Sequence, residues 1–174
     1  MKAQPVAGLD PSGPFHENAA RIVRTRLEEL YSFDPAIRDP SNVTELHDMR
    51  IAAKRLRYVL EIVGFAFGPA GKSIQTEATW LLEVLGEVHD CDVLIPLVDE
   101  HVDQLRDIDR DHLLAFRGDA TALATTPNRT RYRGLEGLVA FSEARRQLRY
   151  AEFVEHWDRL LASQFRERVE SALV

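Results

Sequence analysis

Residues 46–67 read LHDMRIAAKRLRYVLEIVGFAF, and their apolar residues recur at alternating steps of three and four. This spacing collects side chains along one face of an α-helix. The apolar face consists of Leu46, Met49, Ala53, Leu56, Leu60, Val63 and Phe67. At the start of this segment, the pair Asn42 and Glu45 is similar to a capping box, which marks a helix N-terminus. At its end, Gly68-Pro69 is typical of the residues that terminate a helix. We therefore expect a helix over roughly residues 42–67 that buries this face in a core.

A second stripe of the same helix is basic and lies about 100° around the helix from the apolar face. This basic row consists of His47, Arg50, Lys54 and Arg57. A charged stripe is most often a solvated face with ion pairs to acids three or four residues away. Arg57 has Glu61 at that spacing, but Arg50, Lys54 and Arg55 have no such acid. Because like charges at these spacings repel, the row favours a bound polyanion.

The segment LHDMRIAAKRLRY at residues 46–58 resembles the first motif of the CHAD family, the conserved-histidine α-helical domain. The segment LGEVHDCDV at residues 85–93 is similar to the block that follows that motif in the family. The resemblance covers residues 16–107 well and the remainder loosely. It implies an all-helical domain that binds inorganic polyphosphate along a basic channel, with no catalysis of its own. We expect no cofactor and no metal.

The chain departs from the family in one respect, because typical members look like two consecutive copies of a helical half. Here the His/Arg/Lys motif occurs once. We therefore expect the other wall of the channel to come either from the C-terminal helices or from a second chain in a homodimer.

The candidate phosphate ligands follow from their chemistry. Arginine offers a planar fork of donors, lysine a point charge, and histidine a charge that switches on near neutral pH. The first candidates are the members of the basic row, and His89 and Arg55 are further candidates. The candidates for the opposite wall are Arg21, Arg24, Arg145 and Arg149. A packed histidine bonded to a carbonyl is the structural alternative for His47 and His89.

Length and composition indicate one globular domain, since the chain has 174 residues of which 45% are hydrophobic. We expect a flexible lead at residues 1–14, rich in proline and glycine, and a single helical domain at 15–174. The net charge of -6 argues against a general nucleic-acid-binding surface. Neither a secretory signal nor a membrane span is visible, so we expect a cytoplasmic protein, associated with polyphosphate granules if it binds that polymer.

The apolar periodicity predicts an all-α antiparallel bundle of about five or six helices, some of them long. We expect a helix from Gly71 that Pro96 kinks or divides, and an acidic, water-facing stretch at residues 99–111. Gly86, one turn before His89, would allow close approach of either a ligand or a neighbouring helix. A C-terminal helix should bury Tyr150, Val154, Trp157, Leu161 and Phe165.

Two other functions stay open. The dipeptides His47-Asp48 and His89-Asp90 are similar to those of metal-dependent HD phosphohydrolases, although such an enzyme leaves the basic row unexplained. Alternatively, the row belongs to an interaction module that docks an acidic protein partner or a nucleotide.

Overall fold

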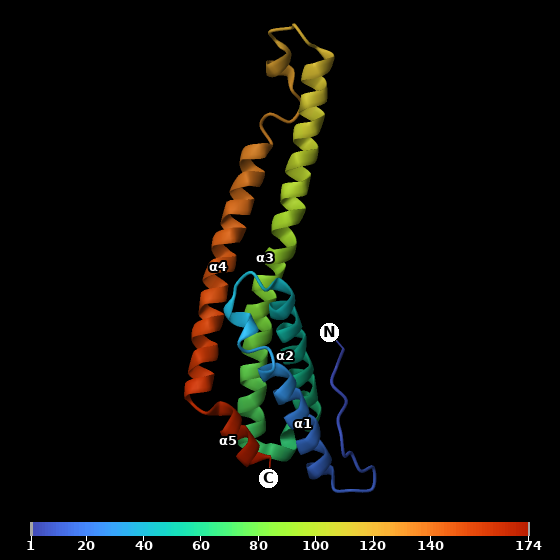
Figure 1. The fold of residues 1–174 in the computed structure, drawn as a ribbon, viewed down its shortest axis with the longest axis vertical. Coiled ribbons are helices and arrows are strands. Elements are labelled where there is room, and N and C mark those ends of the chain that lie inside the picture. The colour runs from blue at the N-terminus through green and yellow to red at the C-terminus, as the bar shows by residue number, and fades with distance from the viewer. Residues whose placement is uncertain (1, 174) are drawn as a thin grey trace. The chain divides into compact units, whose positions relative to one another are not determined.

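All the regular secondary structure in residues 2–173, the part of the chain that the computed structural model describes, is helical (Figure 1). This confirms the predicted all-α class; Met1 and Val174, at the ends of the predicted segments, lie outside the described residues. The α-helices are α1 (Phe15–Tyr31), α2 (Val43–Val63), α3 (Gly68–Ala115), α4 (Tyr132–Ala162) and α5 (Phe165–Ala172). Short 3-10 helices are η1 (Ala36–Arg38), η2 (Gly64–Phe67) and η3 (Ala122–Thr125). No helix in this range is both long enough and apolar enough to cross a bilayer.

The chain divides into two compact units, and helices α3 and α4 contribute to both. Unit 1 contains the residues up to His89 and those from Arg149 onwards, and unit 2 is Asp90–Leu148. The division does not test the prediction of one domain over residues 15–174, which stays a prediction.

The core of unit 1 is built from the faces that the apolar periodicity predicts. All seven residues of the apolar face of α2 and η2 are at most 7% exposed. Helix α1 and the first part of α3 contribute further aliphatic side chains, and the C-terminal segment contributes Phe153, Trp157 and Phe165. Full burial of one such side chain stabilises the fold by about 1.5–3 kcal/mol. The predicted C-terminal apolar stripe is confirmed, although Tyr150, Val154 and Leu161 are only partly buried.

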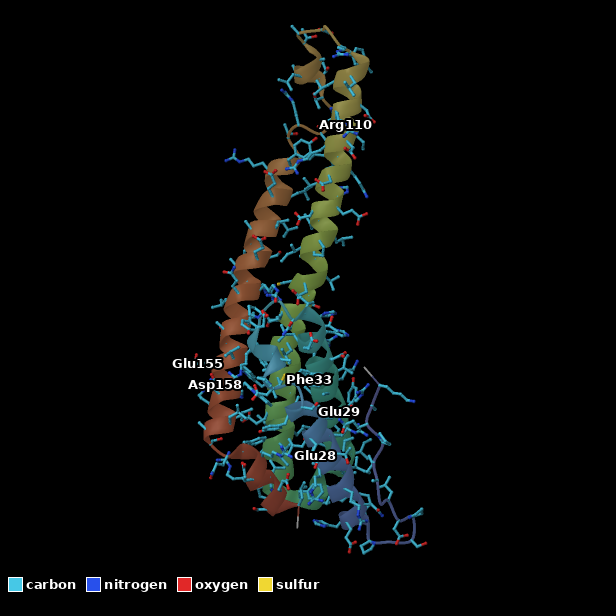
Figure 2. All side chains as sticks on the ribbon, viewed as in Figure 1. Glu28, Glu29, Phe33, Arg110, Glu155 and Asp158 are labelled. Carbon is cyan, nitrogen blue, oxygen red and sulfur yellow. The ribbon has the colours of Figure 1, made fainter. Side chains whose placement is uncertain are left out.

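Buried charges join α1 to α2 and to the N-terminal lead. Two neighbouring glutamates of α1, Glu28 and Glu29, are labelled in Figure 2. Glu29 is fully buried, whereas Glu28 is exposed. The Glu29 carboxylate accepts hydrogen bonds from Arg26 at 2.6 Å and from Arg55 at 2.9 Å. The backbone N–H of Gln4 donates to the same carboxylate at 3.2 Å. These contacts tie Gln4, in the lead that we predicted to be flexible, to the bundle.

Helices α2 and α3 form an antiparallel pair with a very close turn. A Cβ atom built on Gly71 would lie 2.1 Å from the carbonyl oxygen of Gly64, so only glycine permits this approach. Gly68 joins the two helices with φ of 51°, in the left-handed region that favours glycine. At the other end of the pair, His47 of α2 lies beside His89 of α3. The helix predicted for residues 42–67 is therefore α2 followed by η2.

Unit 2 is an antiparallel hairpin of α3 and α4. Two ion pairs fix its register, one between Asp92 and Arg146 and one between Arg106 and Glu136. Pro96 lies inside α3, which is assigned as one helix across it, so the proline does not divide the helix. The predicted water-facing acidic stretch has one exception. Asp109 is 6% exposed and accepts a hydrogen bond from the backbone N–H of Asn128, which anchors the connecting loop.

Candidate functional site

The basic row lies on the side of α2 that faces α3. Two contacts establish this orientation, because His47 meets His89 of α3 while Arg55 meets Glu29 of α1. Helices α1 and α3 therefore flank α2 on different sides. Every side chain of the row is half-buried, between the core and the surface. The row thus borders the junction of α2 and α3 within unit 1.

His47 and His89 form a pair at one end of the row. Their Nδ1 atoms lie 3.3 Å apart and their ring centroids 4.5 Å apart. A hydrogen bond at this distance requires one Nδ1 atom to carry a proton and the other to accept it, and the tautomers of the two rings decide which one donates. Burial, His89 and Arg50 lower the pKa of His47, in that order, and Asp48 opposes them. The environment of His47 therefore disfavours its charged form, and a nearby anion would favour it.

Arg50 and Lys54 are the two cations of the row whose positive charge no carboxylate of the described residues balances. Among the described residues neither has a carboxylate within ion-pair distance. The Nε atom of Arg50 is buried and makes no hydrogen bond within this part of the chain. A buried donor without a partner costs about 1–3 kcal/mol, so such a group calls for an explanation. An anion bound beside α2 would balance the charge of Arg50 and Lys54.

The positive charge of Arg57 is partly balanced by a neighbouring carboxylate. Its guanidinium pairs with Glu61 at 2.9 Å and lies 4.8 Å from the ring centroid of Tyr58. The ammonium of Lys54 lies 5.8 Å from the same centroid. Tyr58 therefore positions two cations of the row, a role that the sequence analysis missed. Its place four residues after Lys54 and one after Arg57 was the available signal.

Gly86 leaves an open space on the surface of α3, beside the basic row. Gly86 precedes His89 by one helical turn and Arg50 follows His47 by one turn, so in this antiparallel pair Gly86 lies level with Arg50. A Cβ atom at Gly86 would meet no atom within 4 Å. Tight helix packing, one of the two explanations considered for this glycine, is therefore wrong. The surface of α3 is therefore open at this point, level with Arg50.

Several predicted ligands are engaged elsewhere. Arg55 binds the buried Glu29 and so supports the α1–α2 contact. Arg21 pairs with Glu17 on its own helix at 3.3 Å, and Arg24 lies 3.9 Å from Glu170 of α5. No described contact joins Arg21 or Arg24 to the basic row.

The two arginines predicted on α4 differ in setting. Arg149, in unit 1, lies 2.7 Å from Glu87 and 2.7 Å from Glu152, and the contact with Glu152 is the main cause of its raised pKa. Two carboxylates thus balance its charge. Arg145 is an exposed residue of unit 2, and its role in binding stays a prediction.

The histidine pair does not by itself supply the ligand set of an HD-type metal-dependent phosphohydrolase. Within residues 2–173 no group of three or more histidine, cysteine, aspartate or glutamate side chains is arranged to hold a metal ion. The pair alone offers two imidazole nitrogens, and catalytic metal sites usually have three protein ligands or more.

The fold and the row define an all-helical protein with a row of cations on one helix, of which Arg50 and Lys54 have no carboxylate partner among the described residues. A family model for the CHAD domain matches residues 21–173. The chain belongs to the CHAD domain family, which is linked to polyphosphate binding. No curated protein and no solved structure matches the chain significantly.

Proposed function

We propose that this protein binds inorganic polyphosphate through the basic row and does not catalyse a reaction on it. The observation that carries the proposal is the pair Arg50 and Lys54, two half-buried cations without a carboxylate partner among the described residues. The pair occurs in a chain with a net charge of -6, where acids outnumber bases. Membership of the CHAD family supports the same ligand.

A linear polyanion suits the geometry of the row. Successive members are three or four residues apart, which places their Cβ atoms about 5–6 Å apart along one line of α2. Polyphosphate repeats its charge along its length, so one chain would engage several cations in turn. The open space at Gly86 leaves room for the polymer beside Arg50. Binding of this kind does not depend on recognising a nucleotide base or a sequence.

Each member of the row has a role in this proposal. Arg50 offers its planar fork to two phosphate oxygens, and Lys54 adds a point charge. Arg57 exchanges its contact with the exposed Glu61 for phosphate, at small cost because ion pairs near the surface contribute about 0–1 kcal/mol. His47 gains a proton as the anion approaches. Arg55 and Arg149 are not among the ligands in this proposal because each binds carboxylates.

The test is a calorimetric titration of the protein with long-chain polyphosphate, ATP and orthophosphate at one moderate salt concentration. Tight binding of the long chain and much weaker binding of ATP and orthophosphate is expected, because each added phosphate engages another cation. Equal affinity for ATP would instead favour a nucleotide-binding module. Phosphate release, followed in parallel with and without Mn²⁺, should stay at the background rate; metal-dependent release would contradict the non-catalytic proposal.

The location of the protein is a separate proposal. A polyphosphate-binding chain without a membrane-spanning helix in its described part should associate with polyphosphate granules in the cytoplasm. Fluorescence of a tagged protein before and after enzymatic removal of cellular polyphosphate would test this association.

A further inference from the structure

The stripe of α2 that carries the basic row continues beyond its last cation. Members of the row are separated by steps of three and four residues, and the next position of the same stripe is Glu61, four residues after Arg57. At the other end the row stops at His47, because α2 begins at Val43, one turn earlier. The row is therefore a line of basic side chains, about 15 Å long at the helical rise, that a carboxylate terminates.

Glu61 is in contact with the last cation of the row. One of its carboxylate oxygens lies 2.9 Å from Nη1 of Arg57. The side chain of Glu61 is 40% exposed and that of Arg57 is 27% exposed, so the pair lies near the surface of unit 1. A phosphate group that binds Arg57 either displaces this carboxylate or lies beside it, where the two anions repel. Glu61 therefore competes with a polyanion at the end of the row.

The stability of α2 does not explain a glutamate at this position. An ion pair between residues four apart stabilises a helix better when the acid precedes the base, and here Arg57 precedes Glu61. Glu61 also lies in the last turn of α2, which ends at Val63, and the helix dipole disfavours anions there. Both effects make glutamate a poorer residue for the helix than glutamine or lysine, whose helix propensities are similar.

We infer that Glu61 sets the end of the binding line and so fixes how many successive phosphate groups one protein molecule engages. The inference rests on the proposed function of the basic row. Up to the carboxylate, each added phosphate meets another basic side chain; beyond it, the next phosphate meets a negative charge. The affinity for polyphosphate should therefore rise steeply with chain length up to the length that spans the row, and then level off. We call this length the limiting length.

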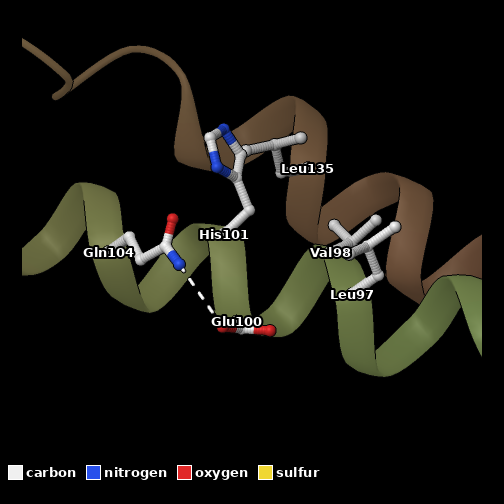
Figure 3. Close-up of a pocket in the computed structure, with 6 residues that line it drawn as sticks. All are labelled: Leu97, Val98, Glu100, His101, Gln104 and Leu135. Carbon is white, nitrogen blue, oxygen red and sulfur yellow. Dashed lines mark hydrogen bonds between the residues drawn. The ribbon is translucent and has the colours of Figure 1, made fainter.

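Glu61 thus determines specificity for chain length without being a phosphate ligand. Two glutamates outside the row are matched controls. Glu17 of α1 pairs with Arg21, four residues later, at 3.3 Å. Glu100 lies in unit 2 and accepts a hydrogen bond from Gln104 (Figure 3). Among the described residues no lysine or arginine lines the hollow of about 410 Å³ drawn there, so a substitution at Glu100 changes the charge of the protein but not the row.

The experiment is calorimetric titration of the full chain with polyphosphates of defined length, from three phosphate groups upwards, at one moderate salt concentration. Glu61→Lys should move the limiting length to longer chains. It should also tighten the binding of long chains at least about tenfold, because one more cation engages the polymer. The slope of log affinity against log salt should become steeper by about 0.7. Glu100→Lys makes the same change of charge and should leave the limiting length where it is.

A second variant frees Arg57 without adding a cation. Glu61→Gln should tighten the binding of long chains about fivefold, the factor that corresponds to a surface ion pair at the upper end of its range. It should leave the free energy of unfolding unchanged, which denaturant melts measure. Glu17→Gln removes an equivalent pair on α1 and should change the affinity less than about twofold, because salt screens a distant charge.

The outcomes separate this inference from the proposed function. Equal tightening by Glu61→Lys and Glu100→Lys, with the limiting length unchanged, would overturn the inference and leave polyphosphate binding at the row intact. A loss of both stability and affinity in Glu61→Gln would show that the carboxylate holds Arg57 in place for binding, which also overturns the inference alone. Absence of binding by the unaltered protein at every chain length would overturn the proposed function and the inference with it.

Discussion

The Nδ1 atoms of His47 and His89 lie 3.3 Å apart, which joins the two sequence motifs at one point of unit 1. The first motif supplies the basic row and the second supplies Gly86, whose open side lies level with Arg50. The histidine pair therefore marks the end of the proposed binding line.

Polyphosphate affinity should rise as the pH falls through the titration range of His47. Burial and neighbouring positive charge lower the pKa of His47 below its usual 6.5, so the free protein holds it largely neutral at pH 7. A bound polyanion favours the protonated ring, and complex formation should therefore take up a proton. Calorimetry in two buffers of different ionisation enthalpy measures this uptake. Proton uptake that is unchanged in His47→Gln would contradict the assignment.

The same histidine should make stability depend on pH. Because its folded-state pKa is below the unfolded value, the unfolded state binds the proton more readily. The contribution of His47 to the free energy of unfolding is therefore present above about pH 6.5 and is lost as the pH falls through the lowered pKa. Urea denaturation at a series of pH values should show this loss, and His47→Gln should reduce it.

The salt dependence of polyphosphate binding should report how many cations of the protein contact phosphate. Replacing Arg50 and Lys54 with glutamine should reduce the slope of log affinity against log salt by about 0.7 for each lost phosphate contact, as for single-stranded nucleic acids. Titrations at several salt concentrations give both slopes. Equal slopes for the two proteins would show that these side chains do not contact phosphate.

Substitutions at Gly86 should separate stability from binding. Gly86→Ala adds a methyl group in open space within a helix and should stabilise the fold by about 0.5–1 kcal/mol. Gly86→Glu places a carboxylate level with Arg50 and should weaken polyphosphate binding at least tenfold while preserving the fold. Gly137→Glu is the matched control, because Gly137 is also a helical glycine with open space around it. A similar loss of affinity in the control would indicate general charge repulsion.

Arg55 should matter for folding rather than for binding. Arg55→Gln removes one of the two arginines that bind the buried Glu29 and should lower the free energy of unfolding by about 1.5–3 kcal/mol. Arg21→Gln removes a surface pair and should cost less than about 1 kcal/mol. Denaturant melts measure both changes. The folded Arg55→Gln protein should retain its polyphosphate affinity, and a large loss would show that Arg55 is a phosphate ligand as well.

The all-helical class and the buried faces could be predicted because the core requires periodic apolar residues. The face from Leu46 to Phe67 and the aromatic positions Trp157 and Phe165 follow this rule. The pairing of Arg55 with Glu29 could not be predicted, since the two residues lie on different helices and no local spacing connects them. The burial of Asp109 is similar, because its partner Asn128 belongs to the loop beyond the end of α3.

The candidate site was predicted in part. The positions of His47, Arg50, Lys54 and Arg57 on one stripe follow from helix geometry alone. Contacts between helices decide whether the charge of a given cation is balanced. Examples are the contacts of Arg149 with Glu87 and of Arg24 with Glu170. The open side of Gly86 likewise depends on where the neighbouring helices lie. Sequence periodicity carries no information on either point.

The most direct measurement is the affinity for long-chain polyphosphate of the variant Arg50→Gln with Lys54→Gln and Arg57→Gln. Its matched control replaces Arg129, Arg131 and Arg133, three exposed arginines of unit 2, with glutamine. Both variants lose three positive charges, so only their positions differ. We predict that the first variant keeps its helical spectrum and loses binding by at least a hundredfold, while the control binds within a few fold of the unaltered protein. Full affinity in the first variant, or equal losses in both, would contradict binding at the basic row.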